Sequence, residues 1–151
     1  MNPTHAQALA LELMRTHLGG EGRWTFRWTR AKREFGHCDY TFRTIALSKP
    51  LTELNDEPQV RDVILHEIAH AMAGPDHGHD AVWKAVARDL GAQPTRCYNG
   101  DTVATPPKPW MGYCPTVGCT TIVERHRLTR VAREQMLCRA HREHIVWQRR
   151  R

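Results

Sequence analysis

The stretch His66-Glu67-Ile68-Ala69-His70 determines how the rest of this 151-residue chain is interpreted. It lies in residues 57–73, where apolar side chains recur at helical spacing until Gly74-Pro75 ends the pattern. Residues four apart on a helix project about 40° apart, so both imidazoles can reach one zinc ion. Glu67 then lies beside the ion, where a carboxylate can take a proton from water whose pKa zinc lowers to about 7.

A catalytic zinc site needs a third protein ligand and keeps a fourth position open for water. The candidates Asp76, His77 and His79 all follow the predicted end of the helix. We prefer His79, because it opens the next predicted helix, from about 80 to 90, and Trp83 can pack beneath it one turn later. His77 and Asp76 stay open as alternatives.

The elements around this helix indicate an α+β fold. Apolar spacing predicts a helix over residues 4–18, which Gly19-Gly20 ends. Residues 23–29 alternate aromatic and polar side chains, and residues 38–47 are rich in aromatic and β-branched ones, so we expect both in a small antiparallel sheet. Residues 30–35 fit a short helix or a turn.

The C-terminal part of the chain is predicted to be a zinc ribbon. It is too short to bury a core unaided, and its ligand pairs Cys114/Cys119 and Cys138/His141 suit a closed structural Cys3His site. His144 could replace His141, and His126 is a weaker candidate. The first residues lack the layout of a secretory signal, which favours metal thiolates over disulfides.

The same C-terminal part is strongly basic. Residues 106–151 carry ten basic and three acidic side chains, a net charge of +7. Residues 1–105 carry 12 basic and 13 acidic side chains, a net charge of −1. Guanidinium groups match phosphate geometry and release counterions, so we expect sequence-independent DNA binding. The candidate contacts are Arg125, Arg127, Arg130, Arg133, Arg139 and Arg142.

Two further predictions concern aromatic residues. Trp24, Phe26, Trp28 and Tyr40 alternate with cations and could stack the bases of a single strand, although strand aromatics more often belong to a core. Tyr40 and Tyr98 are the candidates for an additional oxyanion donor.

Several motifs in order along residues 1–98 resemble the SprT/Spartan-type zinc metallopeptidase domain. These motifs are Trp24-Thr-Phe-Arg-Trp28, Gly36-His-Cys-Asp-Tyr40, Thr44-Ile-Ala-Leu-Ser48, His66-Glu-Ile-Ala-His70, and Gly78-His79 with Trp83. The resemblance implies a zincin-like fold and a DNA-dependent protease that degrades proteins trapped on DNA. Carried over by position, it implies His66, His70 and His79 as zinc ligands and Glu67 as general base.

We therefore expect a SprT-like metallopeptidase domain over residues 1–100, a linker over 101–110 and a basic zinc ribbon over 111–151. The protein would be a zinc metalloendopeptidase with one catalytic and one structural Zn²⁺. It would act in repair by degrading proteins crosslinked to or bound on DNA. The DNA that it binds could be single-stranded. We expect a monomer with no membrane partner, in the cytoplasm at the nucleoid, or in the host cytoplasm for a viral source.

Two alternatives to this function stay open. One is a non-catalytic, zinc-stabilised DNA-binding module, and the other is a regulatory protease that cuts one specific protein partner.

Overall fold

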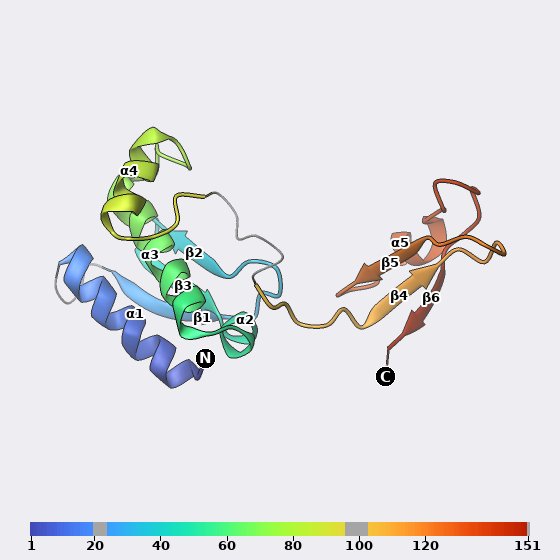
Figure 1. Ribbon diagram of the computed structural model, residues 1–151, viewed down its shortest axis with the longest axis horizontal. Coiled ribbons are helices and arrows are strands. Elements are labelled where there is room, and N and C mark those ends of the chain that lie inside the picture. Colours follow the sequence, from blue (N-terminus) through green and yellow to red (C-terminus); the bar gives the residue numbers. More distant parts are fainter. Residues whose placement is uncertain (20–23, 96–102, 151) are drawn as a thin grey trace. The chain divides into compact units, whose positions relative to one another are not determined.

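The computed structural model describes residues 1–19, 24–95 and 103–150. The chain forms two compact units, Met1–Pro106 and Pro107–Arg151 (Figure 1). Within the described residues, no helix has both the length and the apolar character needed to cross a membrane.

The first unit combines helices with one small sheet. Its helices are α1 (Pro3–Leu18), α2 (Lys49–Leu54), α3 (Glu57–Ala73) and α4 (Ala81–Asp89). Its strands are β1 (Thr25–Thr29), β2 (Gly36–Asp39) and β3 (Thr44–Ser48). The predicted α+β class is confirmed, and so are the helices predicted over residues 4–18, 57–73 and 80–90.

Local sequence sets both ends of α3, the helix that carries the His-Glu-x-x-His motif. The Asp56 side chain accepts a hydrogen bond from Gln59 N at 3.1 Å, and the Gln59 side chain accepts one from Asp56 N at 3.1 Å. This capping box satisfies backbone groups that the first turn would leave unpaired. Gly74 ends the helix at a φ of 94°, where a side chain would be strained.

The sheet corrects one prediction, because it is mixed rather than wholly antiparallel. Its order is β1-β3-β2, with β3 parallel to β1 and antiparallel to β2. The stretch 38–47 is two strands instead of one, since Asp39 Oδ1 accepts from Phe42 N at 3.0 Å and Arg43 takes a φ of 48°, which reverses the chain. Residues 30–35 form a bent segment without a helix.

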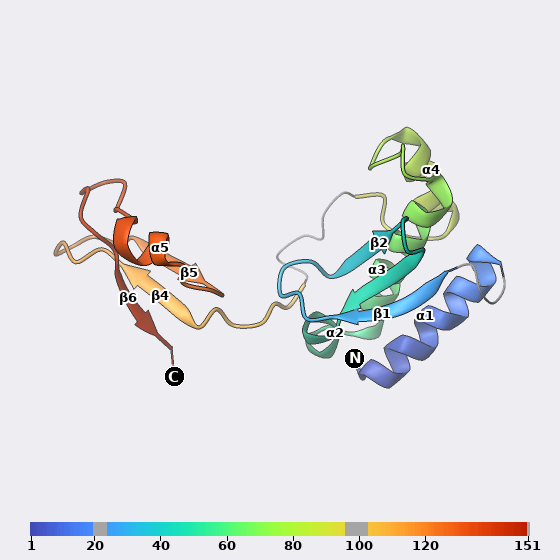
Figure 2. The same ribbon diagram turned by 180° about the vertical axis from the view of Figure 1, so that it is seen from behind.

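The core lies between the sheet and the helices α1 and α3, which cover one sheet face (Figure 2). The central strand β3 is buried over its whole length. Trp24, Phe26 and Trp28 are half-buried against this core. They therefore contribute to the core with part of each side chain, and the stacking role stays a prediction.

The second unit is a small three-stranded sheet with a short helix. Its elements are β4 (Trp110–Tyr113), β5 (Ile122–Arg125), α5 (Arg130–Gln135) and β6 (Val146–Arg149). The strands are antiparallel in the order β5-β4-β6. Its buried cluster consists of Cys114, Cys138 and Ile145, which is too little apolar surface to hold a domain without a staple.

Candidate metal centre

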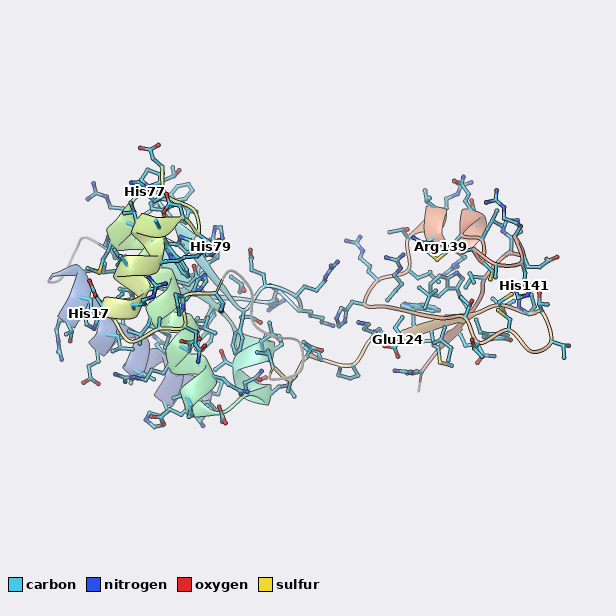
Figure 3. All side chains as sticks on the ribbon, turned by 45° about the horizontal axis from the view of Figure 1, so that its top comes forward. His17, His77, His79, Glu124, Arg139 and His141 are labelled. Carbon is cyan, nitrogen blue, oxygen red and sulfur yellow. The ribbon has the colours of Figure 1, made fainter. Side chains whose placement is uncertain are left out.

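Three imidazoles converge at the C-terminal half of α3. His66 and His70 lie one turn apart on that helix, and His79 comes from the loop that precedes α4 (Figure 3). His79 Nε2 lies 3.1 Å from His66 Nε2 and 3.1 Å from His70 Nε2. The three ligand atoms all lie within 4.8 Å of one another.

This geometry and chemistry fit a tetrahedral zinc ion. Zinc–nitrogen bonds of about 2.0–2.1 Å place neighbouring ligand nitrogens about 3.3 Å apart, close to the observed separations. Burial, followed by the neighbouring histidines, lowers the pKa of His66 to about 3. Burial and His79 lower the pKa of His70 to about 4. Both rings are therefore neutral at pH 7, which is the form that binds a metal.

The loop between α3 and α4 is tied down at several points. The Tyr40 hydroxyl lies 2.9 Å from His70 O and 3.1 Å from Gly74 O, so it donates to backbone carbonyls at the loop's start. The His70 ring donates to the backbone carbonyl of His77. At the loop's end, Asp80 accepts from Trp83 N at 3.0 Å and from His77 Nδ1 at 2.8 Å. These contacts fix the segment that presents His79.

Trp83 forms the floor beneath the three rings. Its own ring is fully buried, and its centroid lies 4.7 Å from His66, 5.1 Å from His70 and 4.5 Å from His79. A rigid aromatic surface on that side restricts the imidazole rotamers and excludes water. The prediction that Trp83 packs beneath His79 is confirmed.

Glu67 is buried next to this group, with 6% of its surface exposed. Burial, and then the charge of Glu34, raise the pKa of its carboxyl to about 8, while a hydrogen bond from the Cys38 backbone opposes the rise. A Cβ on Gly36 would lie 2.6 Å from Glu67 Oε1, so only glycine lets β2 approach so closely. Sequence reasoning missed this role, although a glycine at the start of a strand is a known sign of close backbone approach.

These groups share one cleft of about 690 Å³. His66, Glu67, His70 and His79 line it, and His77 lies on its wall. Within the described part of the chain, His77 and Asp76 are outside the three-histidine group.

Tyr40 and Tyr98 were the two candidates for an additional oxyanion donor. Tyr40 lines the cleft, but its hydroxyl is engaged by the backbone of the α3–α4 connection, and burial raises its pKa to about 12. The Tyr40 hydroxyl therefore has a structural role, because it holds the backbone of this connection in place. Tyr98 lies outside the described residues.

A second group of candidate metal ligands lies in the ribbon. Cys114 Sγ and Cys138 Sγ each lie 3.8 Å from His141 Nδ1, and Cys119 Sγ lies 3.9 Å from Cys138 Sγ. Zinc–sulfur bonds of about 2.3 Å predict sulfur separations of about 3.8 Å. The four ligand atoms lie within 4.8 Å of one another, and His126 and His144 are not among the groups found in the described residues.

The surroundings of two ribbon thiols, Cys119 and Cys138, favour the thiolate form, whereas the pKa of Cys114 is raised. The Thr121 hydroxyl lies 3.5 Å from Cys138 Sγ, and together with the His141 backbone N–H it lowers the pKa of Cys138 to about 5. The same hydroxyl lowers the pKa of Cys119. Thiolates are the ligands of zinc, so these hydrogen bonds prepare the group for a metal.

All six predicted DNA-contacting arginines are exposed. Arg130 pairs with Glu134 at 3.1 Å, and the Arg133 guanidinium lies 5.7 Å from the Trp110 ring centroid. The remaining four make no ion pair within the described residues; they are Arg125, Arg127, Arg139 (labelled in Figure 3) and Arg142.

The fold and the side chains together define a class of protein. A helix that carries two imidazoles and an adjacent buried carboxylate, completed by a third imidazole from the following loop, is the arrangement of mononuclear metallopeptidases. The profile of the SprT-like family matches residues 6–103, and the chain belongs to this family. The predicted resemblance is confirmed, and family membership together with the three-histidine group supports a metalloprotease.

One solved structure is similar to this chain at low identity. It is the metallopeptidase zymogen of Methanocaldococcus jannaschii jannalysin, with a TM-score of 0.47 and 16% sequence identity over 64% of this chain and 85% of that chain. No curated protein matches the chain.

Proposed function

We propose that this protein is a zinc-dependent endopeptidase in which His66, His70 and His79 hold the ion and Glu67 is the general base. One observation carries the proposal. A buried carboxylate and three imidazoles line the same cleft, and the carboxylate follows the first of those imidazoles directly in the chain.

The chain's own residues can perform the proton transfers of peptide hydrolysis. Zinc, when bound, supplies a Lewis acid that acidifies water and polarises the scissile carbonyl. Glu67 takes the proton of the attacking water and later donates it to the leaving amine. Burial raises its pKa to about 8 in the metal-free protein, and a bound cation would lower this value again because a nearby positive charge favours the carboxylate.

We further propose that the basic ribbon tethers the peptidase to DNA and that its substrates are proteins crosslinked to or bound on DNA. Exposed arginines without ion pairs and the net charge of +7 over residues 106–151 support a phosphate-binding surface. Tethering raises the effective concentration of enzyme near DNA-bound proteins, so the cleft needs little selectivity of its own. In this account the protein works as a monomer in a DNA-containing compartment.

Glu67→Gln tests the catalytic part. The amide keeps the shape of the side chain but cannot accept the proton, so we expect turnover of a DNA-bound protein to fall at least about 100-fold, the usual size of a general-base contribution. Zinc content and DNA affinity should stay at the wild-type level. Equal turnover by both proteins would reject Glu67 as base, whereas no turnover by either protein would leave the non-catalytic DNA-binding module as the better account.

Arginine substitutions test the tether. Arg125→Gln, Arg127→Gln and Arg139→Gln together should weaken DNA binding and lower the slope of log K against log salt by about 0.7–0.9 per lost phosphate contact. The matched control replaces three exposed arginines of the first unit, Arg15→Gln, Arg61→Gln and Arg88→Gln. DNA affinity unchanged in the ribbon variant would instead favour a protease whose ribbon docks one protein partner.

A further inference from the structure

One wall of the cleft comes from a segment distant in sequence from the catalytic helix. Val103 and Thr105 line the cleft together with Leu51 of α2 and Phe35, which precedes β2. Val103 is half-buried against the core. The segment therefore borders the same space as Glu67 and the three imidazoles.

A single buried side chain holds this segment in place. Asn55 is 3% exposed, and its amide oxygen accepts from Ala104 N at 2.8 Å while its amide nitrogen donates to Ala104 O at 2.8 Å. The same nitrogen donates to Leu51 O at 2.7 Å. The amide thus pairs with both backbone groups of Ala104, as a neighbouring strand would, and this fixes Val103 and Thr105 on either side.

The wall that results contains three apolar residues, Phe35, Leu51 and Val103, beside Thr105. Phe35 and Leu51 are joined through Ser48, whose backbone N–H donates to Phe35 O at 2.8 Å and whose hydroxyl accepts from Leu51 N at 3.2 Å. Asn55 then connects Leu51 to the segment that carries Val103. Phe35, Leu51 and Val103 therefore line the same cleft as the imidazoles and Glu67.

We propose that Phe35, Leu51 and Val103 form an apolar subsite that takes one apolar side chain of the peptide substrate. Asn55 is a positioning residue that holds Val103 in this wall. The inference rests on the proposed peptidase function, because it concerns the substrate of the same cleft. An apolar wall cannot hydrate a charged side chain, so a leucine should be preferred to an aspartate by at least about tenfold.

The test measures binding rather than turnover. We would use the full-length, zinc-loaded Glu67→Gln variant and two fluorescein-labelled decapeptides of glycine and serine, one with a central leucine and one with a central aspartate. Fluorescence anisotropy should give a Kd at least about tenfold lower for the leucine peptide. Equal Kd values, or no detectable binding of the leucine peptide, would overturn the subsite.

Substitutions in the wall test whether its residues cause the preference for the leucine peptide. Val103→Ser and Asn55→Ala, each added to Glu67→Gln, should bring the two Kd values to within about twofold of each other, since a polar or displaced wall loses the apolar contact. Leu11→Ser removes a 49%-exposed apolar side chain of α1 outside the cleft and is the matched control. If Asn55→Ala unfolds the protein, Val103→Ser still tests the subsite. A tenfold ratio of the two Kd values retained in Val103→Ser would refute the assignment of the leucine preference to this wall.

This experiment separates the two proposals. Loss of the leucine preference with intact hydrolysis by the wild-type protein would refute the subsite alone. Absence of hydrolysis with an intact leucine preference would refute the peptidase and leave a peptide-binding cleft.

Discussion

At the scale of single residues, catalytic competence depends on small groups around Glu67 and the imidazoles. Gly36 leaves room for the carboxylate, and Trp83 supports the rings from below. The pentapeptide and its chemistry could be predicted from the sequence, because helical spacing alone places His66 and His70 on one face. The role of Gly36 could not be predicted from the sequence, since it depends on how closely β2 approaches α3 in three dimensions.

Gly36→Ala should impair catalysis without removing the ligands. The new Cβ would lie 2.6–2.8 Å from Glu67 and Val63 atoms, so either the strand or the carboxylate must move. We expect a loss of about 1–3 kcal/mol in the free energy of unfolding and at least a tenfold lower kcat. Steady-state kinetics and chemical denaturation measure the two effects.

Gly78→Ala is the control for this prediction. Its added Cβ meets nothing within 4 Å, although it is also a glycine on the cleft. If both alanine variants lose activity equally, the close packing of Gly36 on Glu67 is not the cause.

At the scale of elements, the site depends on how the α3–α4 loop is held. The sequence predicted α3 and α4 because apolar spacing and glycine stops are local signals. It favoured His79 as third ligand but left Asp76 and His77 open, since a loop of few residues can fold back in several ways. Likewise, alternation in residues 25–29 tells which side chains share a face but not that β1 pairs in parallel with β3.

Asp80→Ala should weaken metal binding. Asp80 caps α4 and accepts from His77, so its loss frees the segment that presents His79. We expect about 0.5–2 kcal/mol lower stability, as for other N-caps, and about 10–100-fold weaker zinc affinity, as for other residues that orient ligands. A competitive chelator titration measures the affinity.

Asp56→Ala provides the comparison, because it removes the cap at the far end of α3. It should lower stability by a similar amount and leave zinc affinity unchanged. A parallel loss of zinc affinity in both variants would show that Asp80 acts only through general stability.

At the scale of the whole molecule, each unit carries its own group of candidate metal ligands. The basic ribbon could be predicted from the segregation of charge and from paired cysteines, but α5 could not, because residues 130–135 are too few to show helical periodicity. The contact between Asn55 and Ala104 was also invisible in the sequence, since it joins residues 49 positions apart.

Cys138→Ser should lower the zinc content from two ions per chain to one and unfold the ribbon, since the unit has only a small apolar cluster. The first unit should keep its fold and its zinc, because it has its own core. Cys38→Ser, which changes a thiol outside both groups, should keep two ions. Elemental analysis gives the counts, and a count of two in Cys138→Ser would contradict the ribbon site.

The central claim is that three imidazoles from α3 and the following loop bind a zinc ion beside Glu67. The most direct measurement is an anomalous difference map, recorded at the zinc absorption edge, from crystals of the full chain grown with zinc. The account predicts one peak about 2.0–2.1 Å from a ring nitrogen of each of His66, His70 and His79, and a second peak among Cys114, Cys119, Cys138 and His141. A map with no peak between the three histidines would contradict it.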